Sequence, residues 1–513
     1  MSADEPRKSL PRARGRAWRV VLGLISMLVI VAVFAAALFL RPFASLVDRA
    51  AVGSSAVTNE VSTEQLQAYC PSRMDLVDTE AYGDSEFQVS TGNVASSARY
   101  AAFGSVYRAQ VSPLGPDYAT DSETLADQED GDVLTLAGDV DDGARVMDTR
   151  LLASENGTGS AASVVSWATE GDIQGLSAST CVVPSLEHAF LLTDTQSGVT
   201  QQLIVANPTD RATAITIQAW GTADGERLAL STGNTMTVDA YGEASVDLGA
   251  AASGQDGVYV TLSSDETPVA AVVRTVRMDG LTARGSDYAL PVDAASRGAM
   301  LPGVREGDET AVEVFGESDG DVTVYWVGED GLTQAAQGTV SANRVAVFDL
   351  QTAPEGVRGV FVDASTPVAA GARIQRSGGD GQADFALVRA AEPAASSAVV
   401  LPDGVDGELT LMNDSSASAR VTLHAYDADG VEVDERTVTL DARSAQSLAV
   451  ADLEGEARML TLDDEDAAVG WGVRLSHPDV DDAGLAGIAY LGATALTPVR
   501  ETVSARNDQS IVR

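Results

Sequence analysis

The stretch VTLSSDETPVAAVVRTV at positions 260–276 occurs again, in altered form, as VFVDASTPVAAGARIQR at 360–376. The five residues TPVAA, at 267–271 and 366–370, are identical in the two copies. A third copy, LTLDDEDAAVGWGVRLS, occupies 460–476 and has lost the Thr-Pro pair. Apolar and polar residues alternate through much of these segments, which predicts β-strands. We therefore expect a β-module that is repeated about every 100 residues.

The sequence upstream of each copy supports the same repeat. ATAITIQAWGTADGERL (212–228), GDVTVYWVGEDGLTQ (320–334) and ARVTLHAYDADGVEV (419–433) each alternate, reach an aromatic residue and then a glycine-containing turn. None of the modules contains a long amphipathic helix pattern, and the period exceeds that of a propeller blade. The fold expected is all-β, with tandem immunoglobulin-like β-sandwich domains behind one N-terminal transmembrane helix. The predicted repeats are 186–297, 298–395 and 396–500, and residues 69–185 are predicted to form a diverged N-terminal β-domain.

The N-terminal 40 residues differ from the rest of the chain. Residues 1–19 are rich in arginine, and residues 20–40 contain no charged residue. A run of this length and composition is typical of a transmembrane helix, with the basic tail in the cytoplasm and the C-terminal body outside. The alternative is a cleaved signal peptide, cut near 52–56. The expected localisation is the cell membrane, single-pass, with residues 41–68 as a polar stalk and 501–513 as a frayed tail.

Net charge and cysteine content limit the possible partners and compartment. The formal net charge of −42 argues against binding to nucleic acid. The two cysteines, Cys70 and Cys181, are expected to form a disulfide outside the cytoplasm. Two separate buried thiols are the alternative.

A search for catalytic motifs finds none, so we expect no enzyme and no bound cofactor. The three histidines do not have metal-ligand spacing, and no nucleophile elbow, Walker loop or dinucleotide-binding fingerprint is present. The acidic clusters at 139–143, 463–466 and 479–482 could bind Ca²⁺, although solvated turns are the simpler interpretation.

Two kinds of residue recur at matching places and are candidate binding residues. Trp220 and Trp326 each precede the turn glycine by five positions, and exposed aromatic residues there could stack on sugars. Arg274, Arg373 and Arg474 occupy one position of the three copies and could contact a ligand. Core packing of the tryptophans and structural ion pairs of the arginines are the alternatives.

The segments WATEGDIQGLSASTCVVP (167–184) and LIVANPTDRATAITI (203–217) resemble an actinobacterial envelope family, domain of unknown function 5719. The resemblance rests on the combination of Glu170-Gly171-Asp172, Gly175-Leu176, Cys181 and Asn207-Pro208, and extends from about Cys70 to the C-terminus. It implies an actinobacterial source and a membrane-anchored extracytoplasmic protein. It implies no activity.

The function expected from these observations is a non-catalytic structural, scaffolding or binding role in the cell envelope. The expected partners are the membrane, through residues 20–40, and envelope polysaccharide or envelope proteins. Three alternatives remain open: a polysaccharide-binding module, an enzyme or accessory subunit of envelope glycan assembly, and an adhesin. A cleft with two carboxylates ~5–10 Å apart would favour the enzyme.

Overall fold

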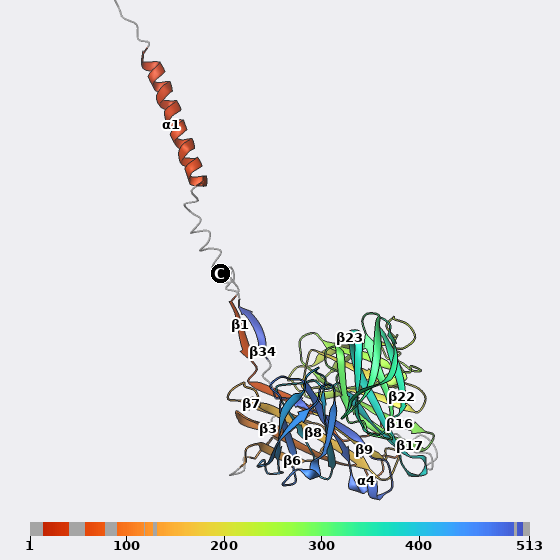
Figure 1. The fold of residues 1–513 in the computed structure, drawn as a ribbon. Coiled ribbons are helices and arrows are strands. Elements are labelled where there is room, and N and C mark those ends of the chain that lie inside the picture. The colour runs from red at the N-terminus through yellow and green to blue at the C-terminus, as the bar shows by residue number, and fades with distance from the viewer. Residues whose placement is uncertain are drawn as a thin grey trace, which may run out of the picture. The chain divides into compact units, whose positions relative to one another are not determined.

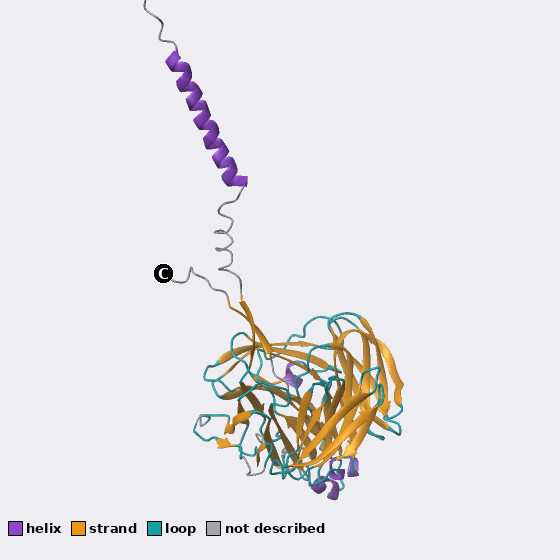
Figure 2. Cartoon of the chain, turned by 60° about the vertical axis from the view of Figure 1, so that its left-hand side comes forward, coloured by secondary structure: helices purple, strands orange, loops and turns teal. Residues whose placement is uncertain are grey.

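The computed structural model describes residues 14–39, 57–76, 90–116, 118, 120–126, 131–496 and 500–505. The chain divides into two compact units, one made of residues 1–62 with 500–513 and the other of residues 63–499. The first unit contains helix α1 (Arg14–Phe39) and an antiparallel pair of strands, β1 (Val57–Ser62) and β34 (Arg500–Ala505). The second unit is built almost entirely of antiparallel strands (Figures 1 and 2).

The first unit differs from the expected stalk and tail in one respect. Residues 57–62 belong to the predicted stalk and residues 501–505 to the predicted tail, yet they pair in register as β1 and β34. Because the partners are more than 400 positions apart, short-range sequence patterns could not indicate this pairing. The rest of the predicted tail lies outside the described residues.

The expected transmembrane helix was placed at residues 20–40. Over the residues that the structure describes, no helix combines the length and the apolar character needed to cross a membrane.

The described residues between 65 and 180 form two sheets, which we call the first module. The first sheet has the order β2 (Gln65–Cys70), β7 (Arg145–Leu151), β4 (Val106–Pro113) and β5 (Glu123–Thr124). The second sheet has the order β6 (Leu134–Gly138), β3 (Ala95–Phe103), β8 (Gly159–Ala168) and β9 (Gly175–Thr180). Apolar side chains of both sheets, among them Tyr100 and Met147, pack into one core.

The second module follows the same plan. One sheet contains β10 (Glu187–Leu192), β15 (Val258–Ser264), β12 (Thr213–Trp220) and β13 (Thr235–Val238). The other contains β14 (Gly242–Asp247), β11 (Val199–Asn207), β16 (Ala270–Asp279) and β17 (Thr282–Ala289), and the short helix α3 (Leu248–Ala251) follows β14.

The third module has one long strand that belongs to both sheets. The first half of β23 (Val357–Ser377) pairs with β18 (Ser296–Pro302) and β20 (Gly320–Gly328), and β20 pairs with β21 (Gly331–Val340). Its second half pairs with β19 (Glu309–Gly316) and β24 (Ala383–Arg389), and β19 pairs with β22 (Arg344–Thr352). The 3₁₀ turn η2 (Gly379–Gly381) separates β23 from β24.

The fourth module completes the series. Its first sheet contains β33 (Thr494–Ala495), β25 (Ser396–Val400), β30 (Met459–Asp463), β27 (Ala419–Tyr426) and β28 (Glu432–Leu440). Its second sheet contains β29 (Ala445–Ala449), β26 (Asp406–Asn413), β31 (Val469–Ser476) and β32 (Ala489–Gly492). Two short helical turns, η3 (Val450–Asp452) and α4 (Pro478–Asp482), lie in its loops.

All four modules share one strand order. If the strands of a module are numbered one to eight along the chain, one sheet has the order 1-6-3-4 and the other 5-2-7-8, with β23 serving as strands six and seven. In the fourth module β33 is a ninth strand, paired with strand one. Residues 69–185 therefore follow the repeat in topology, although their sequence matches it poorly. The first module thus keeps the strand pairing of the repeat, although its sequence has lost the repeated pattern.

The repeated TPVAA stretch lies where the chain passes from one sheet to the other. In the second module Pro268 stands between β15 and β16, whereas in the third module Pro367 lies within β23. A proline has no backbone N–H to donate to a ladder, which suits this crossing point. The Thr-Pro pair of the stretch therefore marks the junction between two strands of opposite sheets.

The four modules close into a ring, because each packs against the next and the fourth packs against the first. Between the first and second modules, Tyr288 Oη donates to Ser72 O (2.7 Å), and between the second and third the rings of Tyr259 and Phe315 stack at 3.8 Å. Between the third and fourth, Arg474 forms an ion pair with Asp308. Between the fourth and first, Asp132 N donates to Gly430 O (2.8 Å). Figure 1 shows the strands of the C-terminal module, in blue, beside those of the first.

The predicted disulfide between Cys70 and Cys181 is confirmed. It connects the end of β2 to the residue that follows β9, so it joins the two sheets of the first module within its core. The bridge closes a sequence separation of 111 residues.

We expect the double variant Cys70→Ser/Cys181→Ser to lose roughly 2–4 kcal/mol of unfolding free energy, because the unfolded chain is no longer constrained. Urea unfolding of the full-length chain, followed by tryptophan fluorescence, measures this loss. A reductant should shift the wild-type midpoint and leave the double variant unchanged. If the wild type does not respond to the reductant, the bridge does not stabilise the fold.

Candidate functional site

The eighth strands of the four modules meet at the centre of the ring. β9, β17, β24 and β32 lie against one another there. Asp384 of β24 is fully buried and accepts hydrogen bonds from Leu176 N (2.8 Å) of the first module and Ile488 N (3.0 Å) of the fourth. Asp287 of β17 is also buried, and it accepts from Ala178 N (3.1 Å) and Leu387 N (2.7 Å). These two carboxyl groups thus join backbone from all four modules, and we call the arrangement the hub.

Two glycines make room for Asp384. Gly175 and Gly285 have φ angles of +135° and +102°, and a Cβ built on either would lie within 2.6 Å of an Asp384 oxygen. Glycine is required at such positions both for its left-handed backbone and for its missing side chain.

Burial without a charged partner changes the ionisation of the hub. It raises the pKa of Asp287 to about 8, although the hydrogen bonds from Leu387 and Ala178 oppose the change. Burial also raises the pKa of Asp384 well above its usual value, and the neighbouring Asp287 raises it further.

A cavity of about 770 Å³ opens beside the hub, where the eighth strands end. Its lining comes from every module: the end of β9 and the loop after it, the loop at 290–295 after β17, Arg389 and Glu392 from β24 and its loop, and 493–495 after β32. β10 and β15 of the second module form one wall. The volume falls in the range of small-molecule sites. We take this central cavity as the candidate functional site.

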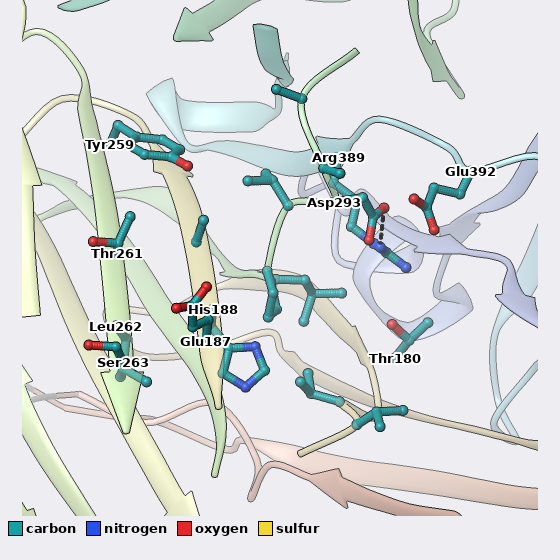
Figure 3. A pocket seen from close by; sticks show the side chains of 18 of the residues that line it. Thr180, Glu187, His188, Tyr259, Thr261, Leu262, Ser263, Asp293, Arg389 and Glu392 are labelled. Atoms are coloured by element: carbon teal, nitrogen blue, oxygen red, sulfur yellow. Dashed lines mark hydrogen bonds and ion pairs between the residues drawn. The ribbon is translucent and has the colours of Figure 1, made fainter. Parts of the chain in front are cut away.

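A charged group lies at one side of the central cavity (Figure 3). Arg389 Nη1 donates to Asp293 Oδ2 at 2.9 Å, and both side chains are about three-quarters buried. Burial raises the pKa of Asp293, and the charge of Arg389 opposes this. Burial and the charge of Asp293 raise the pKa of Glu392. The two carboxyl groups are positioned to accept hydrogen bonds from a ligand.

The opposite wall presents hydroxyl groups and a histidine. Thr261 and Ser263 of β15 and Tyr259 line it, beside Glu187 and His188 of β10 (Figure 3). His188 Nε2 lies 2.6 Å from Val269 O, and burial lowers the pKa of this imidazole. A carbonyl oxygen can only accept, so Nε2 holds the proton and the neutral ring keeps a lone pair on Nδ1. The wall therefore offers mainly hydrogen-bond acceptors and hydroxyls.

The structure places the three predicted arginines outside the cavity, where each module faces the preceding one. Arg274 Nη2 donates to Ser72 Oγ (2.6 Å) and Arg73 O (2.8 Å) of the first module. Arg474 makes two hydrogen bonds to the fully buried Asp308 of the third module. Arg373 hydrogen-bonds to Gln375, and burial with the nearby Arg277 of the second module lowers its pKa. The hydrogen bonds of Arg274 and Arg474 therefore connect neighbouring modules, whereas that of Arg373 stays within its own strand.

We expect Arg474→Met to lose about 2–3 kcal/mol of unfolding free energy, because it leaves Asp308 buried with only Arg376 paired to its charge. Urea unfolding measures the loss. Arg420→Met is the matched control: Arg420 lies exposed in the same module, and its change should stay within ~0.5 kcal/mol. Equal midpoints for the two variants would contradict the connector role.

The two predicted tryptophans lie in different surroundings. Trp326 is buried in the core of the third module. Trp220 is half-buried between modules, with its ring 6.0 Å from both Tyr259 and Phe315, and Arg227 lies over it at 5.6 Å. Within the described part of the chain, neither lines the central cavity, to which Tyr259 contributes an aromatic ring.

In the described ranges, potential metal ligands do not converge at the acidic turns that were considered for Ca²⁺. His424, Glu432 and Glu435 instead bring their ligand atoms within 4.8 Å of one another on the surface of the fourth module. An irregularity between the pairs Ala425–Asp434 and Tyr426–Glu432 places both glutamates beside His424. Such a β-bulge re-aims a side chain and cannot be predicted from strand alternation.

The residues that sequence reasoning missed are Asp293, Arg389, Glu392 and His188. A signal for two of them was present, since Asp293 and Glu392 are 99 positions apart, the same spacing as the two TPVAA copies. They occupy equivalent loops after the eighth strands of the second and third modules. The equivalent position of the fourth module, 200 residues after Asp293, is Ala493, which also lines the cavity.

Comparison with known proteins gives one family match. The model of a family of unknown function, DUF5719, matches residues 135–451, which confirms the resemblance in the sequence. No curated protein matches the chain.

Solved structures give only distant similarity. A dimeric latent PorU from Porphyromonas gingivalis is 9% identical over 67% of this chain and 32% of that chain, with a TM-score of 0.12. The α-L-rhamnosidase of Streptomyces avermitilis in complex with L-rhamnose is 10% identical over 82% and 58%, with a TM-score of 0.11. A glycosyl hydrolase family 2 member from Bacteroides cellulosilyticus is 9% identical over 87% and 36%, with a TM-score of 0.10. The chain spans less than two thirds of each, and these scores support no functional argument.

Proposed function

The chain belongs to the DUF5719 family of unknown function, and from that premise we propose that it is a non-catalytic binding protein of the cell envelope. Its ligand is a polyhydroxylated molecule, an envelope glycan, held in the central cavity. The observation that supports this proposal is the composition of the cavity: carboxylates, hydroxyls and a neutral imidazole converge there from all four modules. Such groups exchange hydrogen bonds with sugar hydroxyls.

The test is binding of oligosaccharides to the purified full-length chain, measured by calorimetry. Thr261→Trp should abolish binding, because Thr261 lines the cavity and an indole would fill part of it. Thr237→Trp is the control, since Thr237 is exposed on β13 of the same module. Saturable binding that is lost in the first variant and kept in the second supports the proposal, and equal binding by both contradicts it.

A second candidate function is glycan hydrolysis, favoured by the presence of both Asp293 and Glu392 on the cavity. Hydrolases of this kind use two carboxyl groups. Release of reducing ends from a bound glycan, lost in Glu392→Gln, would establish it. A bound glycan recovered intact leaves the binding function alone.

We also propose that residues 20–40 associate the protein with a membrane and that the body lies outside the cytoplasm. The support is the uncharged sequence of this segment, the basic residues before it, the disulfide and the exposed apolar side chains of residues such as Leu28 and Phe34. Retention in the membrane pellet after alkaline extraction, with protease access to the body in intact cells, tests both points. Release by alkali would contradict an integral anchor.

The modules are proposed to be a variant of the immunoglobulin-like sandwich. As in that fold, strand two pairs with strand five and strand three with strand six. Strand one pairs with strand six and strand seven with strand two, which exchanges the usual sheets of the first and last strands. An experimental structure with β10 paired to β11 would contradict this arrangement.

A further inference from the structure

We infer that the central cavity selects ligands with a positive charge, and that sugars with a free amine are the class it fits best. This inference rests on the proposed function and narrows its ligand.

The charge balance of the lining is the first step. Among the described residues, four carboxyl groups line the central cavity, those of Glu187, Asp293, Glu317 and Glu392, against the single guanidinium of Arg389. Arg389 is already paired with Asp293. The lining thus has three more carboxyl groups than guanidinium groups, so it should attract a positively charged ligand and repel a phosphate or a uronate.

The second step is His188, which adds an acceptor and no charge. Its side chain is buried, its Nε2–H is used by Val269 O, and Nδ1 has no hydrogen-bond partner among the described residues. This nitrogen is not among the enclosed atoms that lack a partner, and His188 lines the cavity, so the Nδ1 lone pair is open to a ligand donor. An ammonium or hydroxyl group supplies that donor.

The third step concerns the kind of cation. The cavity also presents the hydroxyls of Thr180, Thr261 and Ser263, which exchange hydrogen bonds with neutral hydroxyls. A bare metal ion would leave these groups without partners, whereas an amino sugar has hydroxyls for them and an ammonium for the carboxylates. Glu392, beside the Asp293–Arg389 pair in Figure 3, is the side chain we assign to the ammonium.

The experiment compares three tetrasaccharides of similar size on the purified full-length chain at a pH of about 6, where an amine is protonated. They are β-1,4-linked glucosamine, its fully N-acetylated form and an oligogalacturonate. We expect glucosamine to bind at least about tenfold more tightly than the acetylated form, and the galacturonate to bind weakest. In Glu392→Gln the preference should shrink severalfold, while Glu355→Gln, an exposed glutamate outside the cavity, should keep it.

The outcomes separate this inference from the proposed function. Equal binding of the glucosamine and acetylated forms overturns the charge selection and leaves glycan binding intact. Absence of binding by any sugar overturns the proposed function itself. An amine preference that persists in Glu392→Gln overturns the assignment of this residue.

Discussion

Replacing Asp384 with alanine is expected to lower the unfolding free energy by roughly 4–6 kcal/mol, because it leaves buried backbone N–H groups without acceptors at about 1–3 kcal/mol each. The orphaned donors are Leu176 N and Ile488 N, with Ser286 N at a longer 3.4 Å. They belong to three modules, so the loss should weaken the ring rather than one sandwich. Urea unfolding of the full-length chain measures the effect, and separate transitions of single modules would appear if the hub couples them.

The matched control is Asp380→Ala, in the exposed η2 turn four residues earlier. This substitution also deletes an aspartate carboxyl group, but one that is exposed to water. The φ of +52° at this position adds some strain for alanine. Asp380→Asn avoids that strain and should be nearly neutral. If Asp384→Ala unfolds at the same urea concentration as these controls, the hub is not a stabilising junction.

The fold class could be predicted because strand alternation and the repeated junction recur at a fixed spacing. The spacing of the TPVAA copies predicted modules of about 100 residues. The same spacing is recognisable in the third copy, although that copy has lost the Thr-Pro pair. The first module was recognised as a β-domain but not as a full repeat, since its sequence lacks the Thr-Pro pair. Its strand pairing is nevertheless the same, because buried alternation, and not identity, determines register.

The ring and its cavity could not be predicted, because both depend on contacts between modules. Asp287 and Asp384 look like ordinary strand residues, and only the approach of strands from other modules makes them acceptors for distant backbone N–H groups. The cavity likewise takes residues from all four modules, which lie far apart in the sequence. The arginines could be seen as a set from their spacing, whereas their partners Ser72 and Asp308 lie in loops outside the repeat pattern.

The unfolding free energy is expected to fall as pH rises from 5 to 8, by roughly 4 kcal/mol through Asp287 alone. Burial raises the pKa of Asp287 from 3.8 to about 8, so the folded protein keeps this proton to about pH 8 while the unfolded chain releases it near pH 4. Between these values the folded state binds one more proton than the unfolded state. Stability from this group is therefore fully present below pH 4 and lost as pH rises through 8, at about 1.4 kcal/mol per pH unit.

Urea unfolding at several pH values on wild type, Asp287→Asn and Asp265→Asn tests the slope. Asp287→Asn should be less stable than the wild type at pH 5, because the amide N–H₂ of asparagine faces a backbone N–H. The amide cannot ionise, so the variant should lose less unfolding free energy as the pH rises. Asp265 is exposed, and its variant should keep the wild-type slope. The difference between slopes isolates Asp287 from other acids with raised pKa values, such as Glu313 at about 7. Parallel slopes in wild type and Asp287→Asn would mean that Asp287 is already ionised in the hub, held by its hydrogen bonds from Ala178 and Leu387.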